Sequence, residues 1–207
     1  MTMASLWIEK RPLLLASTSA TRRALIESAG LPVETQRSGV DERAVENAAQ
    51  TTNLSPLALA YRLAEEKALA VSRRAPDRLV LGGDQILACG ETVFHKADNR
   101  AGARRQLAEL SGRTHALHAA GILARGGEVV ARFDASAHLT MRVLDERAIE
   151  TYLDCVPPGV LQSVGIYQVE DVGIHLFETI EGDHSTILGL PLLPLLAALR
   201  RLGCLAF

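Results

Sequence analysis

A short apolar run that leads through hydroxyl side chains into a helix, at residues 13–23, is the feature that most constrains this chain. The apolar residues 13–16 predict a buried strand, and an amphipathic helix pattern follows the hydroxyl residues 17–19. Arg22 and Arg23 fall in the first turn of that helix, where the positive end of the helix dipole disfavours cations. Hydroxyls, free backbone N–H groups and two guanidinium groups together favour a bound phosphate. The alternative is a hydroxyl N-cap followed by two solvated arginines.

Strand and helix patterns alternate along the rest of the chain. Ser55-Pro56 predicts the start of a long helix, because Ser is a common N-cap and Pro favours the first helical position. Alternating apolar residues predict two long strands, 114–124 and 129–142, around a Gly-Gly turn. Residues 43–55 predict only a loop or a frayed helix. This order of elements favours an α/β fold with a mixed sheet, in one domain over residues 1–207.

Composition excludes several classes of protein. The net charge of −2 lacks the basic footprint of a nucleic-acid-binding protein. The longest apolar run, residues 188–199, is too short to span a bilayer and contains Pro191 and Pro194. The three cysteines are widely spaced and form no C-x-x-C pair, which favours a reducing compartment. We therefore expect a cytoplasmic protein that has neither nucleic acid nor membrane as a partner.

A carboxylate follows an apolar strand near the middle of the chain. Residues 79–81 predict a buried strand that ends in Gly82-Gly83-Asp84-Gln85. Ligands of open α/β sheets bind at the carboxyl ends of strands, and glycines there allow a ligand to approach the backbone. Asp84 at this place can hold a magnesium ion through water or polarise an attacking water. The alternative is a turn aspartate that caps the next element.

Other charged residues stand out less. Lys67 shares a helix face with Leu59 and Leu63, where an apolar residue is expected. Lys96 lies in a predicted loop, and a loop lysine is more often solvated than functional. Glu42 follows Asp41, and the two residues are equally consistent with an exposed acidic turn that has no function.

Several common catalytic and metal-binding patterns are missing. The six histidines form no H-E-x-x-H and no zinc spacing, and His115 and His118 fall on opposite faces of a predicted strand. The sequence contains no G-x-S-x-G motif, no phosphate-binding G-x-x-x-x-G-K and no dinucleotide-binding glycine pattern. We expect most of the histidines to pack in the core or lie on the surface.

Although each signal is weak alone, their order is specific. Eight motifs follow one another along the chain: Ala-Ser-x-Ser-x-x-Arg-Arg (16–23), Val-Asp-Glu (40–42), Leu-Ala-x-x-Lys-Ala (63–68), Gly-x-Asp-Gln (82–85), a loop Lys (Lys96), Leu-Ser-Gly-Arg-Thr-His (110–115), Ser-Val-Gly-x-Tyr-Gln-x-Glu (163–170) and Ile-Glu-Gly-Asp…Leu-Gly-Leu-Pro-Leu (180–192). From about residue 13 to residue 203 the chain resembles the Maf family of nucleoside triphosphate pyrophosphatases, also named septum formation inhibitors. The resemblance implies an elongated α/β fold of the Maf and inosine triphosphate pyrophosphatase type, with helices flanking a mixed sheet and two lobes around a cleft.

The resemblance also implies an activity and a set of site residues. Members of the family hydrolyse nucleoside triphosphates to a monophosphate and pyrophosphate with a divalent metal, Mg²⁺ or Mn²⁺. The implied roles are catalysis by Asp84 as general base with Lys67 and Lys96, substrate binding by Ser17, Ser19, Arg22, Arg23, Gln85 and Glu170, and metal binding by Glu42 and Asp84. The chain departs from the family at Thr21, where an arginine is usual, so that a phosphate contact is either missing or supplied by Arg23. It also has Ala97 where the family usually has proline.

Two positions divide the family by substrate. The dTTP/UTP branch resembles Gly-x-Asp-Thr with a later Gln, whereas Gln85 and Glu170 in this chain resemble the 7-methyl-GTP branch. A carboxylate suits the N–H donors of a guanine edge and repels the carbonyls of a pyrimidine. We therefore expect 7-methyl-GTP or another purine nucleotide as substrate, and the family suggests a homodimer. The alternatives are a dTTP/UTP pyrophosphatase and a non-catalytic, nucleotide-binding regulator of cell division.

Overall fold

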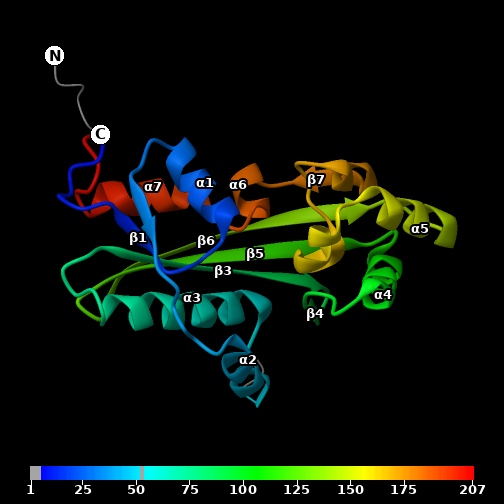
Figure 1. Ribbon diagram of the computed structural model, residues 1–207, viewed down its shortest axis with the longest axis horizontal. Coiled ribbons are helices and arrows are strands. Elements are labelled where there is room, and N and C mark those ends of the chain that lie inside the picture. Colours follow the sequence, from blue (N-terminus) through cyan, green and yellow to red (C-terminus); the bar gives the residue numbers. More distant parts are fainter. Residues whose placement is uncertain (1–5, 52–53) are drawn as a thin grey trace.

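The computed structural model describes residues 6–51 and 54–207, in which seven strands form one mixed sheet (Figure 1). The strands are β1 (Leu13–Leu15), β2 (Val33–Thr35), β3 (Val80–Cys89), β4 (Thr92–Phe94), β5 (Thr114–Arg125), β6 (Glu128–Met141) and β7 (Phe177–Glu181). Their order is β2-β1-β3-β5-β6-β7, with β4 paired to β3. The β1–β2 and β1–β3 pairs are parallel and the other pairs are antiparallel. The predicted α/β class and mixed sheet are confirmed.

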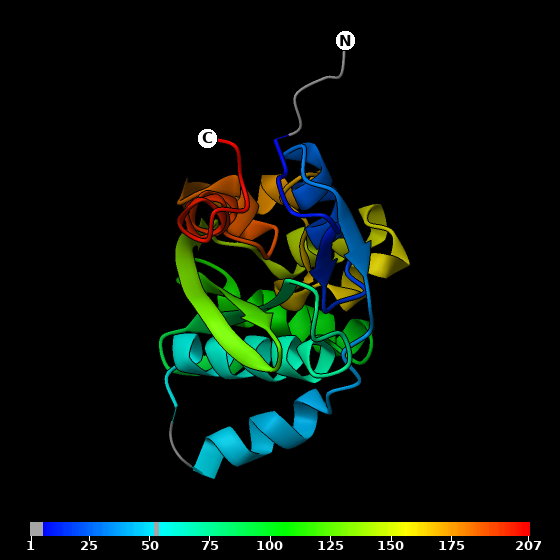
Figure 2. The same cartoon turned by 90° about the vertical axis from the view of Figure 1, so that its left-hand side faces the viewer.

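Helices cover both faces of this sheet. They are α1 (Ala20–Ser28), α2 (Glu42–Thr51), α3 (Pro56–Ser72), α4 (Arg100–Leu110), α5 (Glu146–Cys155), α6 (His184–Ile187), α7 (Leu192–Arg201) and the short 3₁₀ helices η1 (Pro158–Gln162), η2 (Val164–Ile166) and η3 (Val172–Leu176). Helix α3 lies along one face of β3 and β5, while α1 and α7 lie on the other face, and α2 stands beyond α3 (Figure 2). None of the helices in the described residues is long and apolar enough to cross a membrane.

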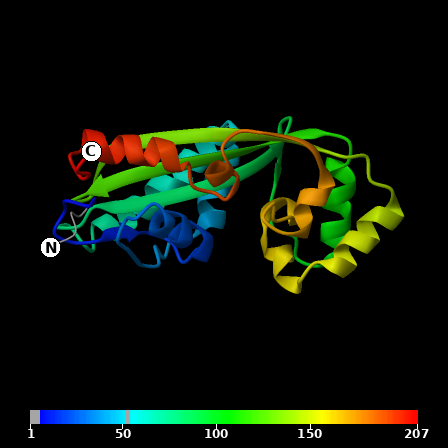
Figure 3. The same cartoon turned by 90° about the horizontal axis from the view of Figure 1, so that it is seen from above.

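The long strands β3, β5 and β6 join two lobes, each with its own core (Figure 3). In the first lobe, which contains α1 and α7, Leu13, Leu81 and Leu195 belong to one buried apolar cluster. In the second lobe, which contains α4, α5 and the 3₁₀ helices, Leu107 and Leu139 belong to another. Each lobe thus has its own core, and a cleft can form between the two.

A close approach of α3 to β3 fixes the first lobe. Ser55 caps α3 as predicted, because its hydroxyl accepts a hydrogen bond from the Ala58 N–H at 3.3 Å. Gly82 faces this helix so closely that a Cβ atom there would lie 2.2 Å from the Ala64 carbonyl oxygen and 2.7 Å from the Ala68 nitrogen. The missing side chain at Gly82 therefore allows the helix backbone to rest on the strand, and it places Lys67 over Asp84.

One prediction of local structure is wrong, and the structure decides between the two alternatives of another. The strand predicted over residues 79–81 continues to Cys89, because β5 pairs with it along residues 80–88, and Asp84 stands in mid-strand rather than at a carboxyl end. For residues 43–55 the helical alternative is the correct one, since α2 takes up residues 43–51, and residues 52–53 lie outside the described residues. Val45 and Ala49 of α2 pack against the apolar cluster that contains Leu59 and Leu63 of α3. This packing stabilises the helix, and the polar composition of the segment does not predict it.

We expect Gly82→Ala to destabilise the fold by about 2 kcal/mol or more, because the added methyl group meets helix backbone that cannot move aside. Gly159→Ala is the matched control, since a Cβ atom there has no neighbour within 4 Å. Urea unfolding of both variants checks this prediction. Equal unfolding free energies for the two variants would contradict the close approach of α3 to β3.

Candidate active site

One edge of β3 is paired with other described strands only at its two ends. On that edge β1 pairs with Val80 and Leu81, and β4 pairs with residues 87–89, while β5 fills the other edge over residues 80–88. Among the described strands, only β5 therefore pairs with residues 82–86. Asp84 and Gln85 lie in this gap and, as neighbours in a strand, point to opposite faces of the sheet. A divided sheet edge is a common place for a ligand site in α/β proteins.

The ammonium group of Lys67 joins two carboxylates in this gap. Its Nζ atom lies 2.5 Å from Asp84 Oδ1 and 2.9 Å from Glu42 Oε1. Lys67 and Asp84 are each only 6% exposed, whereas the Glu42 side chain is about half exposed. The three side chains come from α3, β3 and α2, so the fold has to assemble all three elements to make this contact. The unexpected lysine on the apolar helix face thus has a partner.

The Asp84 carboxyl has a raised pKa. Burial is the main cause, because it disfavours the charged form, and the Glu42 carboxylate adds to it. Lys67 and Arg22 oppose the effect by stabilising the negative charge. A carboxylate with a raised pKa accepts a proton more readily than an exposed aspartate does, which suits a general base.

The segment between β1 and α1 lines the cleft beside this group. Ser19 is the N-cap of α1 and its hydroxyl accepts the Arg22 N–H at 3.3 Å, while the Ser17 hydroxyl accepts the Ser19 N–H at 3.1 Å. The first turn of α1 contains no acidic residue. Ser17, Ser19 and Arg22 all line the cleft, so the free N–H groups and positive dipole of a helix start face the same space as Asp84.

The two arginines of the first turn have different surroundings. Arg22 Nε donates to the Gly189 carbonyl at 2.8 Å, and the side chain forms part of the cleft wall. Arg23 Nε instead bonds Glu27 Oε1 at 2.8 Å on the exposed side of α1. The structure therefore brings Arg22 into the site and leaves Arg23 outside it. Thr21, which stands where the family usually has an arginine, also lines the cleft.

Gln85 holds the C-terminal end of α6. Its Nε2 atom donates to the Thr186 carbonyl at 2.8 Å and to the Ile187 carbonyl at 3.0 Å. A Cβ atom at Gly189 would lie 3.5 Å from Gln85 Oε1, and its φ of +94° also favours glycine. Both N–H bonds of the Gln85 amide are thus used within the protein, and its Oε1 atom is the group left for a ligand.

Lys96 and Glu170 lie on the wall that belongs to the second lobe. Lys96 is exposed in the loop between β4 and α4, and Gln106 Nε2 supports this loop by donating to the His95 carbonyl at 2.7 Å. Glu170 is exposed in the segment between η2 and η3. Both side chains line the same cleft as Asp84, so the structure brings every predicted site residue except Arg23 to one space.

The cleft has a volume of about 880 Å³ and two chemically different parts. Its polar part, from the first lobe and α2, includes Ser17, Ser19, Arg22, Glu42, Lys67 and Asp84. Its apolar side chains come from the second lobe and the segment after α6, where Phe94, Leu117, Val164, Tyr167, Val169 and Leu188 stand beside the charged Lys96, Asp98 and Glu170. A molecule with an anionic end and a flat apolar end matches this division.

The acidic residues of the cleft suit a divalent cation only together with a bound substrate that supplies further oxygen atoms. In the described part of the chain, no three His, Cys, Asp or Glu side chains meet in a ready-made metal cage. Glu42 and Asp84 do converge on one point, where Lys67 Nζ contacts one oxygen of each. Magnesium is commonly held by one or two carboxylates plus phosphate oxygens of a substrate, and this pair of carboxylates fits that donor set.

Sequence reasoning missed several residues of the cleft. Arg43 and Glu46 of α2 line it, and the polar pattern of residues 43–55, which predicts a loop or a frayed helix, does not single them out. The carbonyl of Gly189 bonds Arg22, and the Leu-Gly-Leu-Pro motif at this position was the available signal. Tyr167 was also within a quoted motif, but nothing in the sequence pairs it with His115, whose Nε2 atom lies 2.7 Å from its hydroxyl oxygen.

Comparison with known proteins identifies the family. The family model described as Maf-like protein matches residues 12–202, and the chain belongs to this family. A nucleoside triphosphate pyrophosphatase of Rhodopseudomonas palustris (strain BisB18) is 52% identical over 203 residues, which cover 98% of this chain and 100% of the relative. A 7-methyl-GTP pyrophosphatase of Mesorhizobium japonicum is 52% identical over 193 residues, 93% of this chain and 97% of the relative. The resemblance read from the motifs is confirmed, and both names occur at the same identity.

We expect Lys67→Met to make stability strongly dependent on pH. Without the ammonium group, burial raises the Asp84 pKa further, so the folded chain holds a proton that the unfolded chain has released. The unfolding free energy then falls as pH rises from about 4 toward the raised pKa. The loss relative to wild type is larger at pH 8 than at pH 5, reaching about 3 kcal/mol.

Urea unfolding at the two pH values measures this difference. Lys96→Met is the control, because Lys96 is exposed and its loss leaves no buried charge unpaired. A Lys67→Met deficit that is the same at both pH values would contradict the buried pairing of Lys67 with Asp84.

Proposed function

We propose that this chain is a nucleoside triphosphate pyrophosphatase, which hydrolyses the bond between the α- and β-phosphates and releases a monophosphate and pyrophosphate. The observation that carries the proposal is the buried contact between Lys67 and Asp84, in a cleft that also contains Arg22 and Lys96. The names of the curated relatives support the same activity. Hydrolysis of a phosphoanhydride needs charge stabilisation and positioning above all, and these are the groups that supply both.

The two parts of the cleft suggest how the nucleotide lies. The triphosphate fits the polar part, where the start of α1 offers N–H groups and Arg22 and Lys67 offer positive charge, and Lys96 adds a charge from the facing wall of the second lobe. The base fits the apolar part formed by the second lobe. This orientation brings the α-phosphate close to β3, where Asp84 stands.

Asp84 is the proposed general base. It accepts a proton from the water whose oxygen attacks the α-phosphorus, while the bond from that phosphorus to the pyrophosphate oxygen breaks. Burial raises the pKa of this carboxyl, which increases its affinity for the proton. Lys67, 2.5 Å away, keeps the carboxylate charged before the reaction. The same ammonium group then faces the negative charge that develops on the phosphate oxygens.

A divalent cation completes the proposal. Glu42 and Asp84 would hold Mg²⁺ or Mn²⁺, which when bound would offset negative charge on the phosphate oxygens. The Glu42 side chain is about half exposed, so it can move toward a phosphate-bound ion while Lys67 keeps its contact with Asp84.

For the base we propose a guanine, as in 7-methyl-GTP, or another purine. Glu170 lines the cleft and can accept hydrogen bonds from the N–H groups of a guanine edge. Gln85 donates both N–H groups of its amide to the Thr186 and Ile187 carbonyls, so its Oε1 atom is the group that remains for the nucleotide. A relative that carries the name 7-methyl-GTP pyrophosphatase is consistent with this choice.

The cellular compartment and the assembly of the protein are also proposals. Cys155 is an exposed free thiol, and Cys89 and Cys204 are free as well, which suits the reducing cytoplasm. The substrate is a small soluble nucleotide of that compartment. A homodimer is the expected assembly, and size-exclusion chromatography with light scattering tests it.

We expect Asp84→Asn to lower turnover at least about a hundredfold, because the amide cannot take up the proton of the attacking water. Pyrophosphate release from a panel of nucleoside triphosphates measures this loss, and equilibrium binding of the nucleotide is expected to persist. Asp134→Asn is the matched control, since Asp134 bonds Tyr61 on an exposed part of β6. Near-normal turnover of Asp84→Asn would contradict the assignment. A wild type that binds nucleotides without releasing pyrophosphate would be a regulator instead.

We expect wild type to prefer 7-methyl-GTP or another purine triphosphate over dTTP and UTP by roughly tenfold or more in kcat/KM. Glu170→Gln should narrow the gap, because the amide can donate to a pyrimidine carbonyl as well as accept. Competition among the nucleotides measures the preference, and Glu178→Gln, an exposed change on β7, serves as control. A wild-type preference for dTTP or UTP would reverse the base assignment and leave the pyrophosphatase assignment standing.

A further inference from the structure

The segment that carries Glu170 has a strained backbone. Residues 163–170, here called the binding segment, line the cleft with Ser163, Tyr167 and Glu170 among others. Ile166 has a φ of +62° and is the one residue other than glycine with positive φ in the described parts of the chain. A branched side chain in this region costs free energy, and such a conformation persists only where the surroundings hold it.

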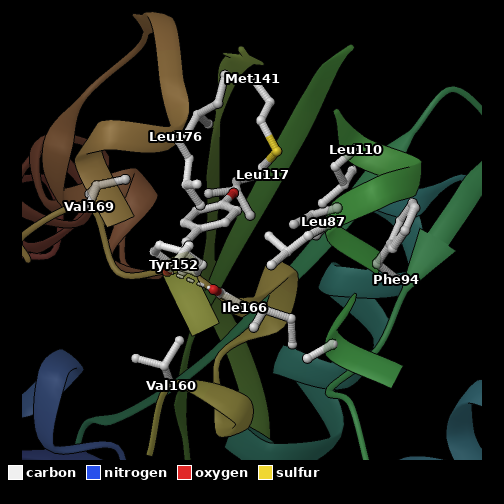
Figure 4. Close-up of a cluster of buried hydrophobic side chains, with 14 of the residues drawn as sticks. Leu87, Phe94, Leu110, Leu117, Met141, Tyr152, Val160, Ile166, Val169 and Leu176 are labelled. Carbon is white, nitrogen blue, oxygen red and sulfur yellow. Dashed lines mark hydrogen bonds between the residues drawn. The ribbon is translucent and has the colours of Figure 1, made fainter. Parts of the chain in front are cut away.

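Two hydrogen bonds tie the strained residue and its neighbour to rigid elements. The Tyr152 hydroxyl, from α5, donates to the Ile166 carbonyl at 2.8 Å (Figure 4). His115 Nε2, from β5, lies 2.7 Å from the Tyr167 hydroxyl oxygen. The Ile166 side chain is fully buried in the core of the second lobe, beside Leu87. The strain at Ile166 is therefore held by three contacts to rigid elements.

Packing alone does not explain a histidine at position 115. The residue is 2% exposed, and burial lowers its pKa to about 4, so it is neutral near pH 7. Its Nδ1 atom is buried and has no hydrogen-bond partner in the described residues. An apolar side chain of similar volume would fill the site and leave no nitrogen unpaired. What the histidine adds is its bond to Tyr167.

We infer that His115, acting through Tyr167, and Tyr152 are positioning residues that hold the strained backbone of the binding segment and so present Glu170 to the base of the nucleotide. The inference rests on the proposed function for what the segment binds. The reacting groups Lys67 and Asp84 belong to α3 and β3 and touch neither His115 nor Tyr152. Loss of either positioning residue should therefore weaken nucleotide binding and leave the chemical step nearly intact.

The kinetic test uses His115→Leu, Tyr167→Phe and the double variant. Each single variant leaves one buried polar group without its partner and should lose stability, whereas the double variant removes both groups and should regain part of it. KM for the preferred nucleotide should rise about tenfold in all three variants, with kcat within about threefold of wild type. If the pair served only packing, KM would recover together with stability in the double variant, and that result would overturn the inference.

His118→Leu is the matched control. His118 lies on the same strand, points to the opposite face and bonds the Ser136 hydroxyl through Nδ1 at 2.7 Å, and it is not part of the cleft wall. Its loss should leave KM unchanged. An equal rise of KM in this variant would show that any histidine on β5 has the same effect, against a specific role for His115.

Hydrogen exchange separates this inference from the proposed function. Amides of residues 163–171 should exchange faster in His115→Leu than in wild type, and those of α1 should not change. If wild type hydrolyses no nucleoside triphosphate, the proposed function fails, and the exchange result still decides whether His115 holds the segment. Unchanged exchange at residues 163–171 would overturn the anchoring itself.

Discussion

A gap in the pairing of β3 is the constraint on which the site depends. β1 and β4 reach the same edge of this strand at its two ends and leave residues 82–86 with β5 alone. A continuous partner strand there would cover Asp84 and Gln85 from the side. The gap also explains why two separate cores exist, since β1 and the helix after it belong to the first lobe and β4 leads to the second. The cleft is thus a consequence of sheet topology rather than of a flexible loop.

Within this gap, burial and charge are balanced against each other. Burying a charged carboxylate or a charged lysine destabilises the fold unless the group is paired. The ion pair between Lys67 and Asp84 offsets this cost for both residues. The same burial gives Asp84 the raised pKa that a base needs. Gly82 is what allows the two groups to meet, because it lets α3 rest directly on β3. One backbone contact therefore controls both the stability of the first lobe and the chemistry proposed for it.

The sequence predicts local features well and distant contacts poorly. Lys67 is recognisable as a polar residue on an apolar helix face, and Ser55 as a cap. Arg22 and Arg23 look alike in a first helical turn, yet they point in different directions, and Glu27 four residues on pairs with Arg23. That pair was a readable signal. The bonds from Gln85 to Thr186 and Ile187 cross about a hundred residues of chain, and no local pattern specifies them.

The charge balance of the cleft supports the proposed need for a cation. Among the described residues that line it, four are lysine or arginine and five are aspartate or glutamate: Arg22, Arg43, Lys67 and Lys96 against Glu42, Glu46, Asp84, Asp98 and Glu170. A triphosphate is itself a polyanion, so a cleft with this balance does not attract it by net charge alone. The basic groups act locally instead, at the start of α1 and beside β3. A divalent ion that enters with the phosphates would offset the charge that these four side chains leave uncompensated.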